Sequence, residues 1–566
     1  AEQDGRQERH ERIGRADRPK RVRAKKPADD ERVRYIIKLL QQVPADHGER
    51  KAQQRFGNGA RRQVDLCQNH RLLLIFRRIL IYHSRYPAVL QVALQIIRIV
   101  CVRRQKSDFF HAKNAGNRLT FRPLRGKMGA NQKIFGGHTM KPYADYTRSE
   151  RCAEYAALQE QYDAWKAKGL SLNMARGKPG PHQMDLAMDL LKMNDYTTDA
   201  GTDARNYGEL EGLQEARVLF ADVFGVKPEE VFVGGNSSLQ LMYNLVNIGY
   251  VFGFPESPCP WSQVEKRKFL CPVPGYDRHF AITEEFGFEL VSVPMTPNGP
   301  DMDIVEKLVA EDPDIKGIWC VPQYSNPDGY TYSDETIERF AKMKTAAPDF
   351  KIFWDEAYIV HHLTDEIIET PVLLNESKKY GNENRVFMFT STSKITFPGA
   401  GVSAIACSES SMKYICKRFS VMIISYDKMN QLRHVRFLKN KEGVLAHMAK
   451  HRRRLVPCFD AVKTAFKNNL IPCGDIAHWT DPKGGYFISL YVMPGCAKRV
   501  AGLCKDAGLT LTGAGSAYPY HKDPEDSHLR IAPTYPSLDE VETASELLCI
   551  CVRLAVAEKL LADKAD

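Results

Sequence analysis

Seven short apolar runs, separated from one another by helical or polar segments, constrain the fold of this chain most strongly. Helical periodicity is present between several of them, as in 237–248 and 333–345. Strands that are apolar on both faces and alternate with helices are typical of a mostly parallel sheet covered on both sides. We therefore expect an α/β fold whose ligands bind at the carboxyl ends of the strands. The runs are Val231–Val233, Lys268–Val273, Glu289–Met295, Gly317–Val321, Lys351–Trp354, Val386–Thr390 and Val402–Cys407.

The positive net charge of the chain, +11, is confined to its first quarter. Residues 1–139 carry 32 Lys+Arg and 12 Asp+Glu, whereas residues 140–566 carry 48 and 57. The acidic remainder gives no electrostatic reason to expect nucleic-acid binding. The 14 cysteines have neither a Cys-x-x-Cys pair nor the spacing of metal ligands. With no secretory signal and no apolar run of about 18 residues, we expect a cytoplasmic protein without a metal or a membrane partner.

The basic segment 1–139 is interpreted in two ways. Gly136-Gly137 can be encoded by GGAGG a few bases before Met140, which is the spacing of a bacterial ribosome-binding site. Our hypothesis is that 1–139 is upstream sequence read in frame, and the alternative is a real basic extension that is disordered. Mass spectrometry of the native N-terminus tests this, because any peptide that precedes Met140 contradicts the hypothesis.

Lys394 follows the sixth apolar run, within the segment Ser391-Thr392-Ser393-Lys394. A lysine that is partly removed from water has a lowered pKa and can form a Schiff base with an aldehyde. The hydroxyls of Ser391 and Ser393 can donate hydrogen bonds to a neighbouring phosphate. The string Ser-x-Ser-Lys is common on protein surfaces, so this segment is informative only in combination with others.

Three other segments that follow apolar runs carry polar side chains suited to the same ligand. Asp355 ends the fifth run, where a buried carboxylate is costly unless it meets a cation such as a protonated pyridine nitrogen. Tyr358 and the amide of Asn326, in the turn Asn-Pro-Asp-Gly, can donate to the phenolic oxygen of such a ring. The segment 234–238, Gly-Gly-Asn-Ser-Ser, precedes an apolar helix and suits an anion, although an ordinary helix cap has the same residues.

In their order and in their positions after strands, these segments resemble the class I/II aminotransferases of pyridoxal-phosphate fold type I. The resemblance covers about 140–566 and implies a large domain with a mostly parallel seven-stranded sheet sandwiched by helices, plus a smaller α+β domain. It implies pyridoxal 5'-phosphate, held as a Schiff base by Lys394, which would also shuttle the proton. Asp355 would pair with the pyridine nitrogen, and Asn326 and Tyr358 would contact the ring oxygen. The implied phosphate ligands are Asn236, Ser237, Ser238, Ser391 and Ser393.

Further matches add residues to the implied site. Tyr276, in Pro274-Gly-Tyr-Asp-Arg-His279, resembles the aromatic residue that stacks on the cofactor ring, and His279 would then lie behind Asp355. Arg530 matches the arginine that binds the substrate α-carboxylate through two parallel hydrogen bonds. Tyr207, in Asn-Tyr-Gly, resembles the tyrosine that reaches the phosphate of a neighbouring subunit, which implies a homodimer with shared active sites.

One position departs from the common pattern of this family. Eight residues after Lys394, where an arginine usually binds the phosphate, the chain has Val402. The segments Lys394–Gly401 and Asn173–Gly180 instead resemble the bacterial aspartate aminotransferases of subgroup Ic. That resemblance places Arg176 and Gly177 at the substrate entrance, with Arg176 as a candidate partner of the substrate side-chain carboxylate. The group that replaces the missing arginine stays open at this point.

The sequence therefore predicts an aspartate aminotransferase that passes the amino group of L-aspartate to 2-oxoglutarate by a ping-pong mechanism. We expect a small domain formed by 140–185 and 426–566, and a large cofactor-binding domain formed by 186–425. One alternative is an aminotransferase or lyase that acts on another amino acid with the same cofactor. The other is a transcription regulator with an aminotransferase-like body, which requires a helix-turn-helix within 1–139, where we find no convincing pattern.

Overall fold

The computed structural model describes residues 141–563. All the described residues lie in one compact unit of the chain. Both interpretations of 1–139 therefore concern residues outside the described part. No helix within 141–563 combines the length and the apolarity that a membrane span requires.

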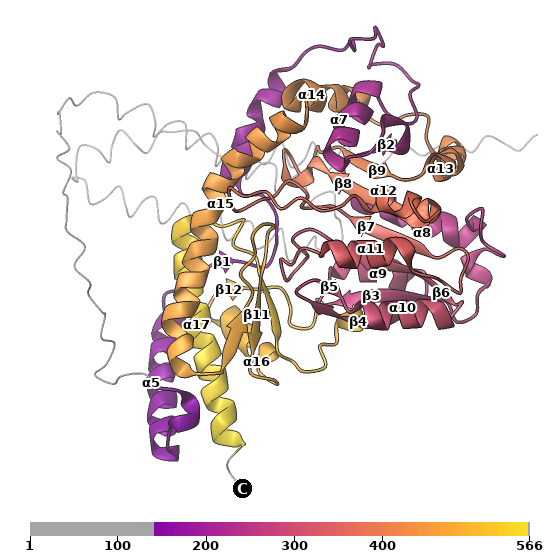
Figure 1. Ribbon diagram of the computed structural model, residues 1–566. Helices are drawn as coiled ribbons and strands as arrows, with labels where there is room; N and C mark the ends of the chain where they lie inside the picture. The colour runs from indigo at the N-terminus through magenta and orange to yellow at the C-terminus, as the bar shows by residue number, and fades with distance from the viewer. Residues whose placement is uncertain (1–140, 564–566) are drawn as a thin grey trace, which may run out of the picture. The chain divides into compact units, whose positions relative to one another are not determined.

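The large sheet has the strand order β2-β9-β8-β7-β6-β3-β4-β5 (Figure 1). The neighbours from β8 through β7, β6 and β3 to β4 are parallel, whereas β9 runs antiparallel to both β2 and β8. Each of the seven predicted runs forms a strand, and the eighth strand, β5, is a two-residue antiparallel addition to β4. The strands are β2 (Val231–Val233), β3 (Lys268–Val273), β4 (Glu289–Thr296), β5 (Gly299–Pro300), β6 (Ile315–Cys320), β7 (Lys351–Asp355), β8 (Val386–Ser391) and β9 (Ser403–Ala406).

Alternate residues of these strands belong to two different apolar clusters, which is why both faces of the sheet need helices. In β7, for example, Ile352 and Trp354 pack into one cluster and Phe353 packs into the other. The first cluster includes side chains from α7 (Gln214–Phe224), α10 (Met302–Glu311), α11 (Asp334–Lys342), α12 (Leu373–Lys378) and α14 (Lys428–Leu438). The second includes side chains from α8 (Ser238–Phe252), α9 (Asp277–Glu285) and α13 (Glu409–Met422). The mostly parallel, helix-covered sheet is thus confirmed.

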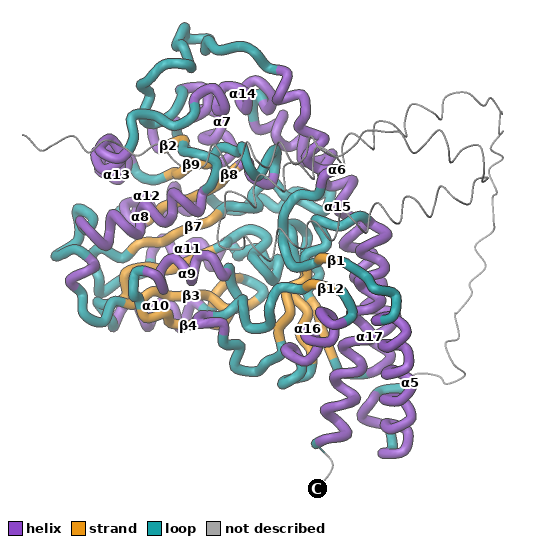
Figure 2. The backbone as a smooth tube through the Cα atoms, turned by 180° about the vertical axis from the view of Figure 1, so that it is seen from behind, coloured by secondary structure: helices purple, strands orange, loops and turns teal. Residues whose placement is uncertain are grey.

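A smaller antiparallel sheet, with the order β10-β11-β13, packs with long helices into a third apolar cluster (Figure 2). Its strands are β10 (Ala477–Trp479), β11 (Ile488–Val492) and β13 (His528–Ile531). The helices are α5 (Arg148–Lys166), α15 (Lys441–Asn469), α16 (Ala497–Asp506) and α17 (Leu538–Ala562). A separate parallel pair joins β1 (Leu172–Asn173) to β12 (Leu509–Thr510). This part has the smaller α+β architecture that the sequence predicts.

The connection between the two parts runs through α14 and α15. Leu432 and Val435 of α14, and Met448 near the start of α15, belong to a cluster of the large sheet, whereas Phe459 and Phe466 further along α15 belong to the cluster of the small sheet. The division of the chain at 185/186 and 425/426 stays a prediction. Short helices join the main elements: α6 (Pro181–Met184) and the 3-10 helices Tyr143–Asp145, Asp185–Lys192, Pro228–Glu230, Trp261–Gln263, Glu383–Arg385, Thr392–Lys394, Ile471–Cys473 and Pro519–His521.

Candidate active site

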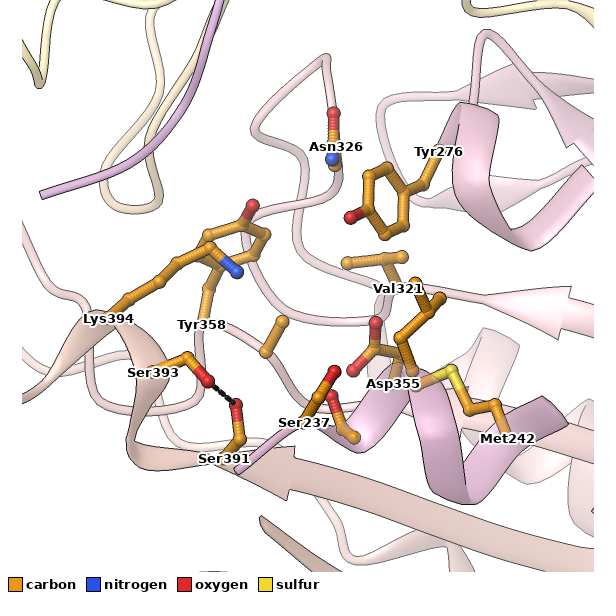
Figure 3. Close-up of a pocket in the computed structure, with 13 residues that line it drawn as sticks. Ser237, Met242, Tyr276, Val321, Asn326, Asp355, Tyr358, Ser391, Ser393 and Lys394 are labelled. Carbon is orange, nitrogen blue, oxygen red and sulfur yellow. Dashed lines mark hydrogen bonds between the residues drawn. The ribbon is translucent and has the colours of Figure 1, made fainter. Parts of the chain in front are cut away.

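Polar side chains from five separate segments line one cavity next to the carboxyl ends of β6, β7 and β8 (Figure 3). Because parallel strands end at the same edge of a sheet, residues that directly follow different strands are brought together there. Most of the residues singled out from the sequence meet in this way. Those that line the cavity are Ser237, Ser238, Tyr276, Asn326, Asp355, Tyr358, Ser391, Ser393 and Lys394.

Lys394 ends the 3-10 helix that directly follows β8. Its ammonium nitrogen lies 4.8 Å from the centroid of the Tyr358 ring. Burial lowers the pKa of Lys394 below its usual 10.5, and the nearby Asp355 carboxylate opposes this shift. The amine is therefore more readily neutral, and hence nucleophilic, than a lysine in water.

Asp355, the last residue of β7, is buried with a relative exposure of 4%. Its Oδ2 lies 3.0 Å from Nε2 of His279, whose ring stacks on Trp319 with centroids 4.6 Å apart. Its Oδ1 is buried and has no hydrogen-bond partner among the described residues. Since an unpartnered buried carboxylate oxygen is costly, this atom is poised for a cationic or hydrogen-donating ligand.

Tyr276, Tyr358 and Asn326 surround the space between Lys394 and Asp355 (Figure 3). Burial raises the pKa of Tyr276 to about 12 and that of Tyr358 well above its usual 10, so both phenols keep their protons. The side-chain oxygen of Asn326 accepts a hydrogen bond from Arg530 at 3.3 Å. This contact leaves the amide protons of Asn326 as donors.

Serine hydroxyls line the end of the cavity next to α8. Ser391 donates to Ser393 at 3.2 Å, and Ser393 donates to the backbone carbonyl of Asn236 at 2.8 Å. Ser237 precedes α8, a helix of 15 residues, and its side chain makes no capping hydrogen bond. Hydroxyls and free backbone N–H groups at the start of a helix favour an anion.

No arginine lines this cavity in the described part of the chain, and Lys394 supplies its one cationic side chain. Val402 is buried, and its backbone N–H donates to the Thr392 hydroxyl at 2.9 Å. In place of a guanidinium, the lining described here presents the hydroxyls of Ser237, Ser238, Ser391 and Ser393. A charged counterpart is absent from the cavity lining as described.

Arg530 reaches Asn326 from β13 of the small sheet. Its Nη1 lies 3.1 Å from Oδ1 of Asp277, and its Cζ lies 5.0 Å from the centroid of the Phe487 ring. Its Nε is buried and, within 141–563, has no partner. A Cβ added to Gly177 would lie 2.3 Å from a ring carbon of Phe487. Gly177 is therefore required by the close packing beneath the guanidinium.

Five sequence-predicted residues do not line the cavity: Arg530 and Gly177, whose contacts are given above, and Asn236, Tyr207 and Arg176. Asn236 contributes its carbonyl to Ser393, Tyr207 is 79% exposed, and Arg176 lies exposed on the loop that follows β1. Conversely, sequence reasoning did not assign Asp277 and Phe487, which contact Arg530. The signal for Asp277 is positional, because it lies within the segment 274–279 that was already singled out.

Comparison with known proteins agrees with this geometry. Residues 146–564 match the family described as aspartate amino-transferase. A putative aminotransferase from Mycolicibacterium smegmatis is 49% identical over 422 residues, covering 74% of this chain and 98% of that protein. An aspartate aminotransferase from Corynebacterium glutamicum is 47% identical over 404 residues, covering 71% and 93%. The crystal structure of an aspartate transaminase from C. glutamicum superposes with a TM-score of 0.72 at 45% identity, covering 74% and 99%. The chain belongs to the aspartate aminotransferase family.

Proposed function

We propose that this aminotransferase acts on L-aspartate and 2-oxoglutarate with pyridoxal 5'-phosphate bound to Lys394. One observation carries the proposal: the Lys394 amine and the unpartnered Oδ1 of Asp355 belong to the same cavity. A pyridine ring that carries an aldehyde needs an amine at the aldehyde and a carboxylate at the ring nitrogen. The familial relationship to an aspartate aminotransferase from C. glutamicum supports the choice of substrate.

The residues present fit this cofactor. Asp355 would hold the pyridine nitrogen in its protonated form, while His279 fixes the other oxygen of the same carboxylate. Asn326 and Tyr358 supply donors for the ring oxygen, and Tyr276 supplies a flat face. The phosphate would bind to Ser237, Ser238, Ser391 and Ser393, with the backbone of Asn236 completing that end of the site.

When bound, the cofactor supplies an electron sink for the carbon from which the substrate proton leaves. The Nζ of Lys394, in its neutral form, would accept that proton and would donate it again later in the reaction. Its lowered pKa suits this role, because burial favours the neutral amine that accepts a proton. Arg530 would bind the α-carboxylate and so orient the bond to be broken. The 2-oxo acid would then reclaim the amino group by the reverse sequence.

The side-chain carboxylate of aspartate needs its own cation. Arg176 is our candidate, since the loop that carries it also carries Gly177, which packs against Phe487 beneath Arg530. Its exposure leaves the guanidinium available to a substrate that enters the cleft.

A homodimer with shared sites forms part of the proposal. Tyr207 is 79% exposed, and the last turn of α13 and the residues after it expose Val421 at 90% and Ile424 at 61%. Large apolar side chains that are neighbours in sequence and face solvent mark an interaction surface. We expect a second copy of the chain to cover them and Tyr207 to contact its phosphate site.

The purified full chain tests the cofactor and the substrate separately. We expect a visible absorption band that aspartate and 2-oxoglutarate shift in opposite directions, and parallel double-reciprocal plots for the two substrates. A panel of amino donors should give the highest kcat/KM with aspartate. A colourless protein that cofactor addition leaves inactive would contradict the cofactor. A coloured enzyme that prefers another donor would contradict the substrate alone.

A further inference from the structure

The small sheet presents a polar face whose residues the proposed function uses only in part. In β11 and β13 polar and apolar residues alternate, and the register pairs Ser489 with Arg530 and Tyr491 with His528. Directly opposed residues, and residues two apart, point to the same side of an antiparallel sheet. These four side chains form what we call the polar face. The intervening residues Ile488, Leu490, Leu529 and Ile531 belong to the apolar cluster on the other side.

This polar face is largely buried. Ser489 is 0% exposed and His528 2%, and the turn that contains Asn326 and Asp328 lies against them. The Tyr491 hydroxyl donates to Oδ1 of Asp328 at 2.8 Å, and the Ser489 hydroxyl lies 2.9 Å from Nε2 of His528. The turn therefore meets the polar face at two points, Asn326 at Arg530 and Asp328 at Tyr491.

Burial sets the protonation states of His528 and Asp328. Burial lowers the pKa of His528 to about 3, so its ring is neutral. Burial raises the pKa of Asp328 to about 6, against the hydrogen bonds from Ser489 and Tyr491, so it is mostly ionised at neutral pH. The other ionisable groups that influence the pKa of Asp328, His528 or Tyr491 are Tyr330, Tyr518, Asp523 and Arg530.

We propose that Asp328, held by Tyr491, is a positioning residue that fixes the turn carrying Asn326 against Arg530 and so orients Arg530 for the substrate α-carboxylate. Asp328 is two residues after Asn326, and His528 is two residues before Arg530. The hydrogen-bonded residue Asp328 is therefore close in sequence to Asn326, and His528 is close in sequence to Arg530. The inference rests on the proposed role of Arg530 in binding substrate.

A structural role alone explains this arrangement poorly. A buried carboxylate that is compensated by neutral hydroxyls costs free energy that an apolar pair of similar volume would avoid. What the hydrogen bonds add is direction, because a donor and an acceptor fix the turn against the strand within a few tenths of an ångström. Asn326 and Arg530 lie on different elements, and the distance between their side chains depends on that precision.

The decisive variant is Tyr491→Phe, studied in the holoenzyme. It removes one hydroxyl and keeps the ring that stacks on His478. We expect the dissociation constant of maleate, a dicarboxylate without a reactive amine, to rise about tenfold in calorimetric titration, which is about 1.4 kcal/mol. KM for aspartate should rise by a similar factor, whereas kcat should change less than about threefold.

The matched control is Tyr162→Phe, which removes a buried hydroxyl that donates to the Leu503 carbonyl in the same small domain. It should leave maleate binding unchanged at a comparable loss of thermal stability. If Tyr491→Phe binds maleate as tightly as the control, the proposal is overturned.

Substitutions of Asp328 provide a rescue test. Asp328→Asn keeps an acceptor oxygen for Tyr491 and should retain most of the affinity, whereas Asp328→Ala should lose as much as Tyr491→Phe. The double variant Asp328→Ala/Tyr491→Phe should be no weaker than either single variant, because both remove the same contact. Additive losses would overturn the proposal.

Arg530→Gln separates this inference from the function on which it rests. It should weaken maleate binding by more than about a hundredfold, the loss of a buried charged hydrogen-bond pair. Unchanged binding in Arg530→Gln would contradict the proposed substrate role itself. A large loss in Arg530→Gln beside unchanged binding in Tyr491→Phe would contradict the positioning role alone.

Discussion

The two sheets of this protein contribute to the site in different ways. The large sheet is apolar on both faces, so its chemistry lies at strand ends: Asp355 ends β7 and Lys394 follows β8 by one helical turn. The small sheet is apolar on one face only, and Arg530, its proposed substrate-binding residue, lies inside a strand. A helix-covered sheet can place polar groups only where its strands stop, whereas a half-apolar sheet can place them at every second position.

This difference separates the two tasks of the site. The residues of the large sheet would act on the reacting bond, whereas those of the small sheet would hold the substrate. Changes at the strand ends of the large sheet should therefore affect kcat first. Changes on the polar face of the small sheet should affect KM first.

Replacement of Lys394 should have the largest effect. Lys394→Ala removes both the bond to the cofactor and the group that moves the proton, so we expect kcat to fall by more than about 10⁴-fold. The visible absorption band should be displaced as well. Lys394→Arg is the matched control, since it keeps the positive charge but cannot bond to an aldehyde. Full activity in either variant, measured in steady-state assays, would contradict the mechanism.

Asp355→Ala should lower kcat by about 10²- to 10³-fold, the scale of a lost preorganised charge. The variant should retain part of its cofactor, because the serine hydroxyls that bind the other end are unchanged. His279→Ala, which frees Asp355 without removing it, should cost much less, about tenfold. Equal losses in the two variants would show that Asp355 matters only through its contact with His279.

Gly177→Ala tests the packing beneath Arg530 of the small sheet. A Cβ would approach a Phe487 ring carbon to 2.3 Å, so the ring must move and Arg530, which lies over it, should shift. We expect KM for aspartate to rise about tenfold with kcat nearly unchanged, a cost of about 1.4 kcal/mol. Gly502→Ala, in α16 with nothing within 4 Å of the added carbon, is the control and should leave KM unchanged. A lowered kcat in Gly177→Ala would contradict the separation of tasks.

The contrast between the sheets also explains what the sequence could predict. All seven strands of the large sheet that were expected are present, because near-continuous apolar runs are unambiguous when helices separate them. The two-residue β5 was not expected, since Gly299 and Pro300 have no strand propensity and pair only because β4 lies beside them. Residues at strand ends, such as Asp355, follow those runs directly and were identified.

The contacts between the two sheets were not predictable in the same way. Asp277 and Arg530 meet at 3.1 Å although 253 residues separate them, and Asp328 and Tyr491 are 163 apart. No local periodicity encodes such pairs, because they depend on how the small sheet docks on a turn of the large domain. The alternation Ile-Ser-Leu-Tyr-Val in β11 does indicate one polar face. It does not indicate that the face is buried.

The smallest expected effect is a shift in the pH at which Lys394 reacts with the cofactor. Burial lowers the pKa of Lys394, so the rate at which apoenzyme bonds to pyridoxal phosphate should rise with pH through a midpoint below 10.5. Asp355 acts in the opposite direction by favouring the charged amine, and Asp355→Asn should therefore move the midpoint to still lower pH. Tyr491→Phe, on the polar face of the small sheet, should leave the midpoint where it is. Stopped-flow absorbance across the pH range measures all three proteins. Tyr491→Phe changes no charge near the amine of Lys394, so a change that affects substrate binding alone should not move the midpoint. If Tyr491→Phe moves the midpoint as far as Asp355→Asn does, the two sheets do not divide their tasks.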